Sequence, residues 1–173
     1  MLPFPRDQVL TPVLVRTTLR PGDIGAIVRL HGIVYAAEYG WDHTFEAMMA
    51  QGLGAFAAAG EVADARLWVA EGDGGVAGCI AIVGQADGAA HLRWFLVDPE
   101  ARGLGIGRRL LDEALAFCRE RGFRSVFLWT VKGLEAAAHL YRSAGFRVTE
   151  EATHERWGAA LTEQRYDLSL MDT

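Results

Sequence analysis

A glycine-rich loop flanked by arginines is the part of the sequence whose residue types and spacing most clearly indicate chemistry. Glycines alternate with other residues over positions 103–107, directly before an amphipathic stretch that predicts a helix. The start of a helix exposes unpaired N–H groups and a partial positive charge, so it attracts anions. Glycine lets a phosphate approach the backbone closely, and Arg102, Arg108 and Arg109 add positive charge with no acid between them. The loop therefore predicts a binding site for a diphosphate group.

The spacing of the loop distinguishes between kinds of diphosphate site. A P-loop requires the string GxxxxGK[ST], which the sequence lacks. A dinucleotide site requires GxGxxG directly after a strand. Here residues 98–102 separate the predicted strand from Gly103, and the glycines run GxGxG. Both observations disfavour a nucleoside triphosphate or a dinucleotide as the ligand.

A different pattern, R/Q-x-x-G-x-G/A, is met by Arg102, Gly105 and Gly107. Downstream, residues 140–146 read LYRSAGF and fit the pattern LYxxxGF. The two motifs are separated by a predicted helix and a predicted strand. Together they resemble the pyrophosphate-binding loop and the following segment of the GNAT N-acetyltransferase superfamily.

The resemblance is strongest over residues 91–146, and the order of elements extends it to a single domain over 1–173. It implies acetyl-CoA as the co-substrate, with no metal. It also implies direct transfer of the acetyl group to a primary amine of a small molecule, a peptide or a protein. The alternative is a non-catalytic acetyl-CoA-binding sensor of the same fold.

The resemblance also places the cofactor. The pantetheine would follow residues 95–97, and the backbone N–H of Leu96 would stabilise the oxyanion. Many relatives carry Asn seven residues before the tyrosine of the second motif, whereas this chain has Leu134, which leaves Thr130 or Lys132 as substitutes. The implied cofactor contacts are Phe95, Leu96, Val97, Arg102, Gly103, Leu104, Gly105, Ile106, Gly107, Arg108 and Thr130.

Tyr141 matches the tyrosine that acts in this superfamily as the general acid for the CoA thiolate. A phenol is protonated at neutral pH and can donate to a departing sulfur anion. Tyr141 also continues a helical stripe with Leu134, Ala137 and Ala138, which is typical of core packing. The two interpretations remain open at this stage.

The general base has several candidates. His91 lies eleven residues before Arg102, where histone-type members place a glutamate base on the same strand. An imidazole that titrates near neutrality suits the role, although a strand-end histidine beside a surface turn is an equally simple interpretation. Glu38, with Asp42 and His43, lies in the segment that links the first two predicted helices, beside the expected acceptor site. Many members use water instead of a dedicated base.

These residues need a scaffold that brings the loop, the strand before it and the helix-linking segment together. The element order β-α-α-β-β-β-α-β-α-β-β predicts an α/β fold of the GNAT type, with a mixed six- to seven-stranded central sheet flanked by about four helices. Gly52 and Gly54 weaken the second helix. Helices are predicted over 23–39, 44–59, from the glycine loop to about 121, and over 134–144, and strands over 13–18, 67–71, 76–83, 91–97, 125–130, 146–151 and 164–170.

Composition narrows the classes of protein that remain. The chain has 173 residues, of which 51% are hydrophobic and 23% charged, as expected for one soluble domain. A net charge of −5 disfavours nucleic-acid binding. With neither a leader-like N-terminus nor an apolar run of about 18 residues, we expect a cytoplasmic protein without a membrane partner. Cys79 and Cys118 are expected as buried thiols, and no histidine spacing suggests a metal. The sequence does not determine the oligomeric state, although the exposed final strands could support a homodimer.

Overall fold

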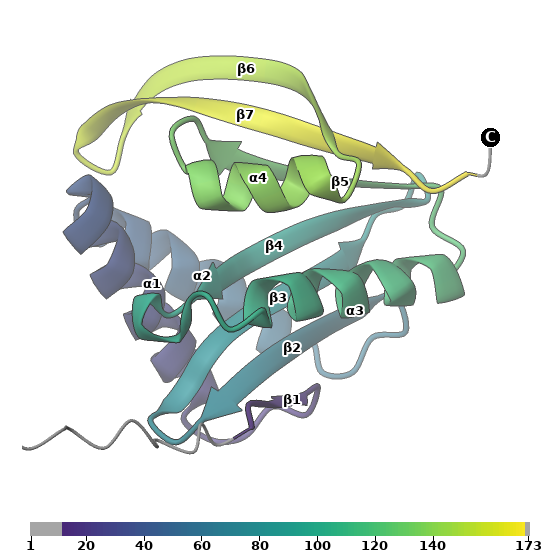
Figure 1. Ribbon diagram of the computed structural model, residues 1–173, viewed down its shortest axis with the longest axis horizontal. Helices are drawn as coiled ribbons and strands as arrows, with labels where there is room; N and C mark the ends of the chain where they lie inside the picture. The colour runs from purple at the N-terminus through teal and green to yellow at the C-terminus, as the bar shows by residue number, and fades with distance from the viewer. Residues whose placement is uncertain (1–11, 172–173) are drawn as a thin grey trace, which may run out of the picture.

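A computed structural model of the chain describes residues 12–171. They form a twisted sheet in the order β1-β2-β3-β4-β5-β7-β6, with α1 and α2 on one face and α3 and α4 on the other (Figure 1). No helix in this range is both long and apolar enough to cross a membrane. The elements are β1 (Leu14–Arg16), α1 (Asp23–Tyr39), α2 (His43–Ala58), β2 (Ala65–Gly72), β3 (Gly75–Gly84), β4 (Ala89–Val97), a 3₁₀ turn η1 (Pro99–Ala101), α3 (Ile106–Glu120), β5 (Ser125–Val131), α4 (Glu135–Ser143), β6 (Arg147–Arg156) and β7 (Ala159–Ser169).

The mixed sheet with helices on both faces confirms the predicted fold. Helix α2 is present as predicted, and it runs unbroken through Gly52 and Gly54. A Cβ at Gly52 would lie 3.2 Å from the Arg93 guanidinium and 3.3 Å from the Trp94 ring, so the glycine lets α2 lie close to the sheet. Strands β6 and β7 are longer than predicted. Strand β6 is an exposed edge strand without apolar alternation, so the sequence pattern did not indicate its full length. A two-residue turn at 157–158 with positive φ joins it to β7.

Two hydrophobic cores lie on opposite faces of the sheet. Strand β3 divides its residues between them, since Ile80 and Ile82 pack with α3 whereas Cys79 and Ala81 pack with α1 and α2. Cys79 and Cys118 are both fully buried, as expected, and burial raises the pKa of each thiol to about 12. Both thiols are therefore protonated at neutral pH.

The sheet opens between β4 and β5. These parallel strands pair only over Ala89–His91 and Ser125–Phe127, beyond which β5 continues to pair with β7 on its other side. Strand β4 also contains a bulge, because Trp94 and Phe95 together oppose Ile80. Trp94 has a φ of 49°, and its carbonyl accepts a hydrogen bond from the Cys79 thiol at 3.1 Å. Within residues 12–171, no other strand covers this edge at the end of β4.

Helix α1 buries one histidine without a full set of partners. His31 is 2% exposed, and its Nδ1–H donates to the Ile27 carbonyl at 2.9 Å. Its Nε2 has no partner among the described residues. Burial lowers the pKa of His31 from 6.5 to about 4. The ring is therefore neutral in the folded protein at neutral pH.

We expect the free energy of unfolding to fall as the pH drops from about 6.5 towards 4, because the unfolded chain binds a proton there that the folded chain does not. This contribution of His31 would approach about 3 kcal/mol at the acid end of the range. Urea unfolding at several pH values would measure it, and His31→Leu should make the profile less steep. His43→Leu, at an exposed position, is the control; equal profiles for the His31 variant and the wild type would contradict this account.

Candidate active site

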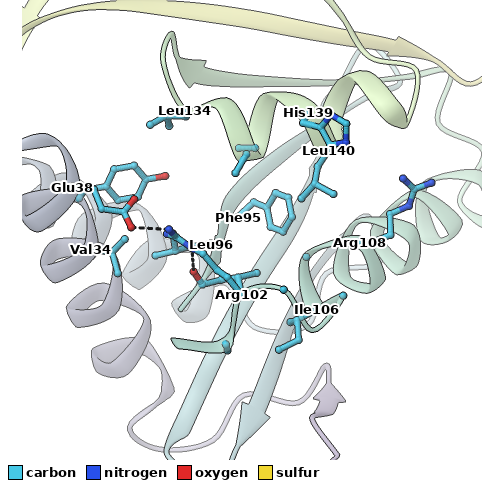
Figure 2. Close-up of a pocket in the computed structure, with 18 of the residues that line it drawn as sticks. Val34, Glu38, Phe95, Leu96, Arg102, Ile106, Arg108, Leu134, His139 and Leu140 are labelled. Carbon is cyan, nitrogen blue, oxygen red and sulfur yellow. Dashed lines mark hydrogen bonds and ion pairs between the residues drawn. The ribbon is translucent and has the colours of Figure 1, made fainter. Parts of the chain in front are cut away.

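A cavity of about 440 Å³ lies where β4 has lost its β5 neighbour (Figure 2). Helix α1, the end of β4, the 101–108 segment and α4 each contribute to its wall. Most of the predicted cofactor contacts line it, whereas Leu104 is half exposed on the outside of the loop and Thr130 pairs with Gln164 in the β5–β7 ladder. The predicted contacts that line the cavity are Phe95, Leu96, Val97, Arg102, Gly103, Gly105, Ile106, Gly107 and Arg108.

The glycine loop ends at the start of α3. Gly103 and Gly105 have φ values of 80° and 77°, a backbone conformation that glycine adopts at little cost. Gly105 is the N-cap of α3, and no side chain caps the helix amides. A Cβ at Gly107 would lie 3.2 Å from Leu140 and 3.5 Å from Val97, so its missing side chain keeps the cavity open. Uncapped amides at an open helix start are suited to a phosphate group.

Two arginines of the loop have acidic partners on α3 that the loop sequence alone did not indicate. Arg108 and Arg109 each form an ion pair one helical turn further along α3, with Asp112 and Glu113, at 3.1 Å. These acids follow in the sequence but lie beside the arginines because of the helical repeat. Both pairs are exposed and therefore weak, so the arginines can still attract an anion together with the helix amides.

Arg102 reaches across the cavity to α1. It forms an ion pair with Glu38 at 2.7 Å, and its Nε donates to the Val97 carbonyl at 3.4 Å (Figure 2). Burial, followed by the neighbouring Glu38 carboxylate, raises the pKa of Tyr39. The pair joins the first residue of the glycine motif to a carboxylate 64 positions earlier in the chain.

The open edge of β4 determines which peptide groups face the cavity. The Val97 carbonyl faces it, since it accepts from Arg102, whereas the Asp98 N–H donates to Ala77 on β3 at 2.8 Å. Peptide groups alternate in direction along a strand, so the Leu96 N–H points towards β3 as well. There its interaction with the Cys79 thiol lowers the pKa of that thiol, against the larger effect of burial, which raises it. The Leu96 amide is thus directed away from the cavity, because the bulge sets the phase of the strand.

Tyr141 lies behind the cavity wall. It is 4% exposed and does not line the cavity, but its ring packs against Phe95, which does, with centroids 6.0 Å apart. Phe146 and Tyr166 pack on it at 5.8 and 5.6 Å. Burial raises the pKa of Tyr141, so the phenol remains protonated throughout the neutral range. The geometry combines core packing with a position next to the site.

Residues 34–146 match the model of the Acetyltransferase (GNAT) family, which is more than half of the chain. The chain belongs to the GNAT acetyltransferase family. An uncharacterized N-acetyltransferase of Schizosaccharomyces pombe is 30% identical over 121 residues, covering 69% of this chain and 74% of that protein. Mycothiol acetyltransferase of Cellulomonas flavigena is 51% identical over 53 residues, which are 31% of this chain and only 15% of that protein.

The structural comparison agrees with the family. The structure of yncA from Salmonella typhimurium, solved with its cofactor acetyl-CoA, superposes with a TM-score of 0.72 at 21% identity. The match covers 93% of this chain and 95% of that one. At this level of identity the likeness establishes the GNAT fold.

The candidate bases of this GNAT member lie in different places. His91 stacks on Phe127 with ring centroids 4.5 Å apart and does not line the cavity. Burial, assisted by nearby arginines, lowers the pKa of His91 to about 4. Asp42 caps α2 by accepting from the Thr44 N–H at 2.9 Å, and His43 is exposed at the start of that helix. Of these four candidates, Glu38 is the one that lines the cavity.

Several lining residues were not anticipated from the sequence. Tyr35 and Val34 on α1 and His139 on α4 belong to the wall, and Leu134 supplies an apolar surface where many GNAT relatives carry Asn. His139 directly precedes the motif residue Leu140, but no spacing in the sequence marked it as a lining residue. Tyr35 gave no signal either, because its position is typical of an ordinary core residue.

An aromatic cluster joins the helix-linking segment to the final hairpin. Trp41 packs against Trp157 with ring centroids 4.5 Å apart, and both contact Phe45. The Asp42 N–H donates to the Trp157 carbonyl at 2.9 Å. The β6–β7 turn is therefore fastened to the end of α1, the helix that carries Glu38.

Proposed function

We propose that this GNAT member transfers an acetyl group from acetyl-CoA to a primary amine of a small molecule, a peptide or a protein. The observation that carries the proposal is the meeting of two binding elements in one cavity, the uncapped start of α3 and the uncovered edge of β4. The first suits a pyrophosphate. The second suits the amides of a pantetheine arm, which would pair with residues 95–97 like a neighbouring strand.

In the proposed reaction the neutral amine attacks the thioester carbonyl carbon. A C–N bond forms, the nitrogen loses one proton to water, the C–S bond breaks, and the sulfur leaves as the CoA thiolate. Backbone amides on the cavity side of β4 would stabilise the oxyanion. Because the Leu96 N–H points towards β3, the amides of its neighbours in the strand are the candidates for stabilising the oxyanion. Tyr141 would return a proton to the sulfur after Phe95 and the cofactor adjust around it.

The acceptor would enter on the α1 side of the cavity. Glu38 and Tyr39 offer a carboxylate beside an aromatic face, an arrangement that attracts a cationic amine. Glu38 would then take the proton that the ammonium must lose before it attacks. A pyrophosphate that draws Arg102 towards α3 would release Glu38 from its ion pair.

We expect Glu38→Gln to lower kcat by about tenfold to a hundredfold, because an amide cannot accept the proton. Acetyl-CoA affinity should be unchanged or higher, since Arg102 loses its charged partner. Steady-state kinetics and calorimetric titration with acetyl-CoA would measure the two effects.

His91→Phe provides the matched comparison, because a phenyl ring can keep the stack on Phe127. We expect it to retain a kcat close to that of the wild type. The opposite pattern, with kcat lowered in the His91 variant and kept in the Glu38 variant, would make His91 the base.

The proposed function is tested by thiol release from acetyl-CoA over a panel of amino acids, polyamines, aminoglycosides and peptides. Turnover with any of these amines supports an acetyltransferase. Tight binding of acetyl-CoA without turnover across the panel would instead support the non-catalytic sensor. Absence of acetyl-CoA binding would contradict both functions.

We also propose that the chain forms a homodimer through β6. This strand of 10 residues is exposed along most of its length and lies at the edge of the sheet, where its outer backbone groups are available for pairing. Val148, which is 43% exposed, adds an apolar contact. Sedimentation velocity should give a dimer, and Val148→Pro should shift it to monomer; a wild-type monomer at micromolar concentration would contradict the proposal.

A further inference from the structure

A second cavity, of about 310 Å³, lies beside β4 on the face of the sheet that α1 and α2 cover. It is bounded by the last turns of α2, the segment that follows α2, the start of β2, the end of β3 and the middle of β4. None of the residues that line it also lines the first cavity. Its walls are largely apolar, and include Ala55, Phe56, Val62, Val83 and Trp94.

One cation, Arg93, lies in this apolar wall. Its guanidinium stacks over the Trp94 indole at 4.4 Å and lies against α2 at Gly52. Burial lowers the pKa of Arg93, although the group remains charged at neutral pH. Asp64, an acid in the same wall, is engaged with Arg121 at 2.8 Å.

The guanidinium of Arg93 has no hydrogen-bond acceptor or ion-pair partner within the described part of the chain. Charged groups that are withdrawn from bulk water are normally paired. Other partly buried arginines of this protein follow that rule, since Arg16 bonds Asp23 and Arg165 bonds Asp167. The guanidinium N–H groups of Arg93 therefore face a cavity with apolar walls and are available to bind an anion.

We propose that this second cavity binds a small molecule that carries a carboxylate on a short apolar body. The planar guanidinium matches a carboxylate with two parallel hydrogen bonds. Phe56, Trp94 and Val83 would cover the apolar part, and the volume suits a ligand at the small end of the usual range. The site is separate from acetyl transfer, so it stands or falls independently of the proposed function.

Isothermal titration of the full chain with hexanoate tests the proposal. We expect saturable binding of hexanoate, and at least tenfold weaker binding of hexanamide, which has the same shape without the charge. Arg93→Gln should weaken hexanoate at least tenfold. Arg66→Gln is the matched control, because Arg66 also stacks on an aromatic ring, Phe117 at 4.4 Å, but lies outside the cavity.

A second variant covers the case in which Arg93→Gln fails to fold. Ala55→Leu narrows the cavity from an exposed helical position that tolerates leucine, and it should weaken hexanoate while Arg93 remains in place. Acetyl-CoA affinity, measured in each variant, reports an intact fold. Equal binding of hexanoate and hexanamide, or full hexanoate affinity in either cavity variant, would overturn the proposal.

Discussion

Tyr141→Phe is expected to lower kcat for acetyl transfer by about a hundredfold while leaving the Kd for acetyl-CoA within about twofold of the wild type. The phenol is buried, and burial raises its pKa, so its proton is available throughout the neutral range. Removing the hydroxyl keeps the ring that packs against Phe95 and Phe146. The loss should therefore fall on protonation of the thiolate and not on folding or cofactor binding.

Tyr166→Phe is the control for this prediction. Its ring lies 5.6 Å from Tyr141 in the same core, and its hydroxyl is 3.5 Å from the Gln164 side chain. A change in kcat shared by both variants would indicate a general effect on the core. Wild-type turnover in Tyr141→Phe would remove Tyr141 from the mechanism and leave it as a packing residue. Equilibrium binding and single-turnover kinetics separate these outcomes.

Gly107→Leu is expected to weaken acetyl-CoA binding by about a hundredfold or more without unfolding the protein. The position lies in the first turn of α3, outside the left-handed region, so leucine is compatible with its backbone. Its side chain would enter the space between Phe95, Val97 and Leu140, which is the space proposed for the cofactor. Calorimetric titration with acetyl-CoA, together with thermal unfolding, would measure the two effects.

Gly54→Leu is the comparison for Gly107→Leu. Gly54 also lies within a helix, and no atom lies within 4 Å of a Cβ built there. It should bind acetyl-CoA as the wild type does. If Gly107→Leu binds acetyl-CoA normally, the cofactor lies elsewhere and the proposed assignment of the cavity is wrong.

Local patterns were sufficient to predict the element order and the glycine loop. The apolar stripe of α3, with Leu110, Leu111 and Ala114 buried, repeats with the helical period and can be read from sequence. The motif around Tyr141 depends on adjacent residues in the same way. Such signals survive without tertiary information because one element contains all of the residues involved.

The details of the candidate site depend on residues that are distant in sequence. The pairing of Arg102 with Glu38 needs α1 and the loop to meet, and no local pattern contains that information. The bulge at Trp94 places a bulky residue at positive φ, against its intrinsic preference. Trp94 also contacts Cys79 on β3 and packs against Gly52 on α2. Because these partners are distant in the sequence, the bulge, and with it the direction of the Leu96 amide, could not be predicted.

The short β4–β5 pairing has a mechanical consequence. Only three residue pairs couple β5, with the β6–β7 hairpin beyond it, to the rest of the sheet. Elsewhere the two parts are connected by the contact of Trp41 with Trp157 and by the shared core around α3. A pantetheine that pairs with the edge of β4 in the gap would make both parts more rigid. Hydrogen exchange at 95–97 and in β5 would then slow together when acetyl-CoA is added.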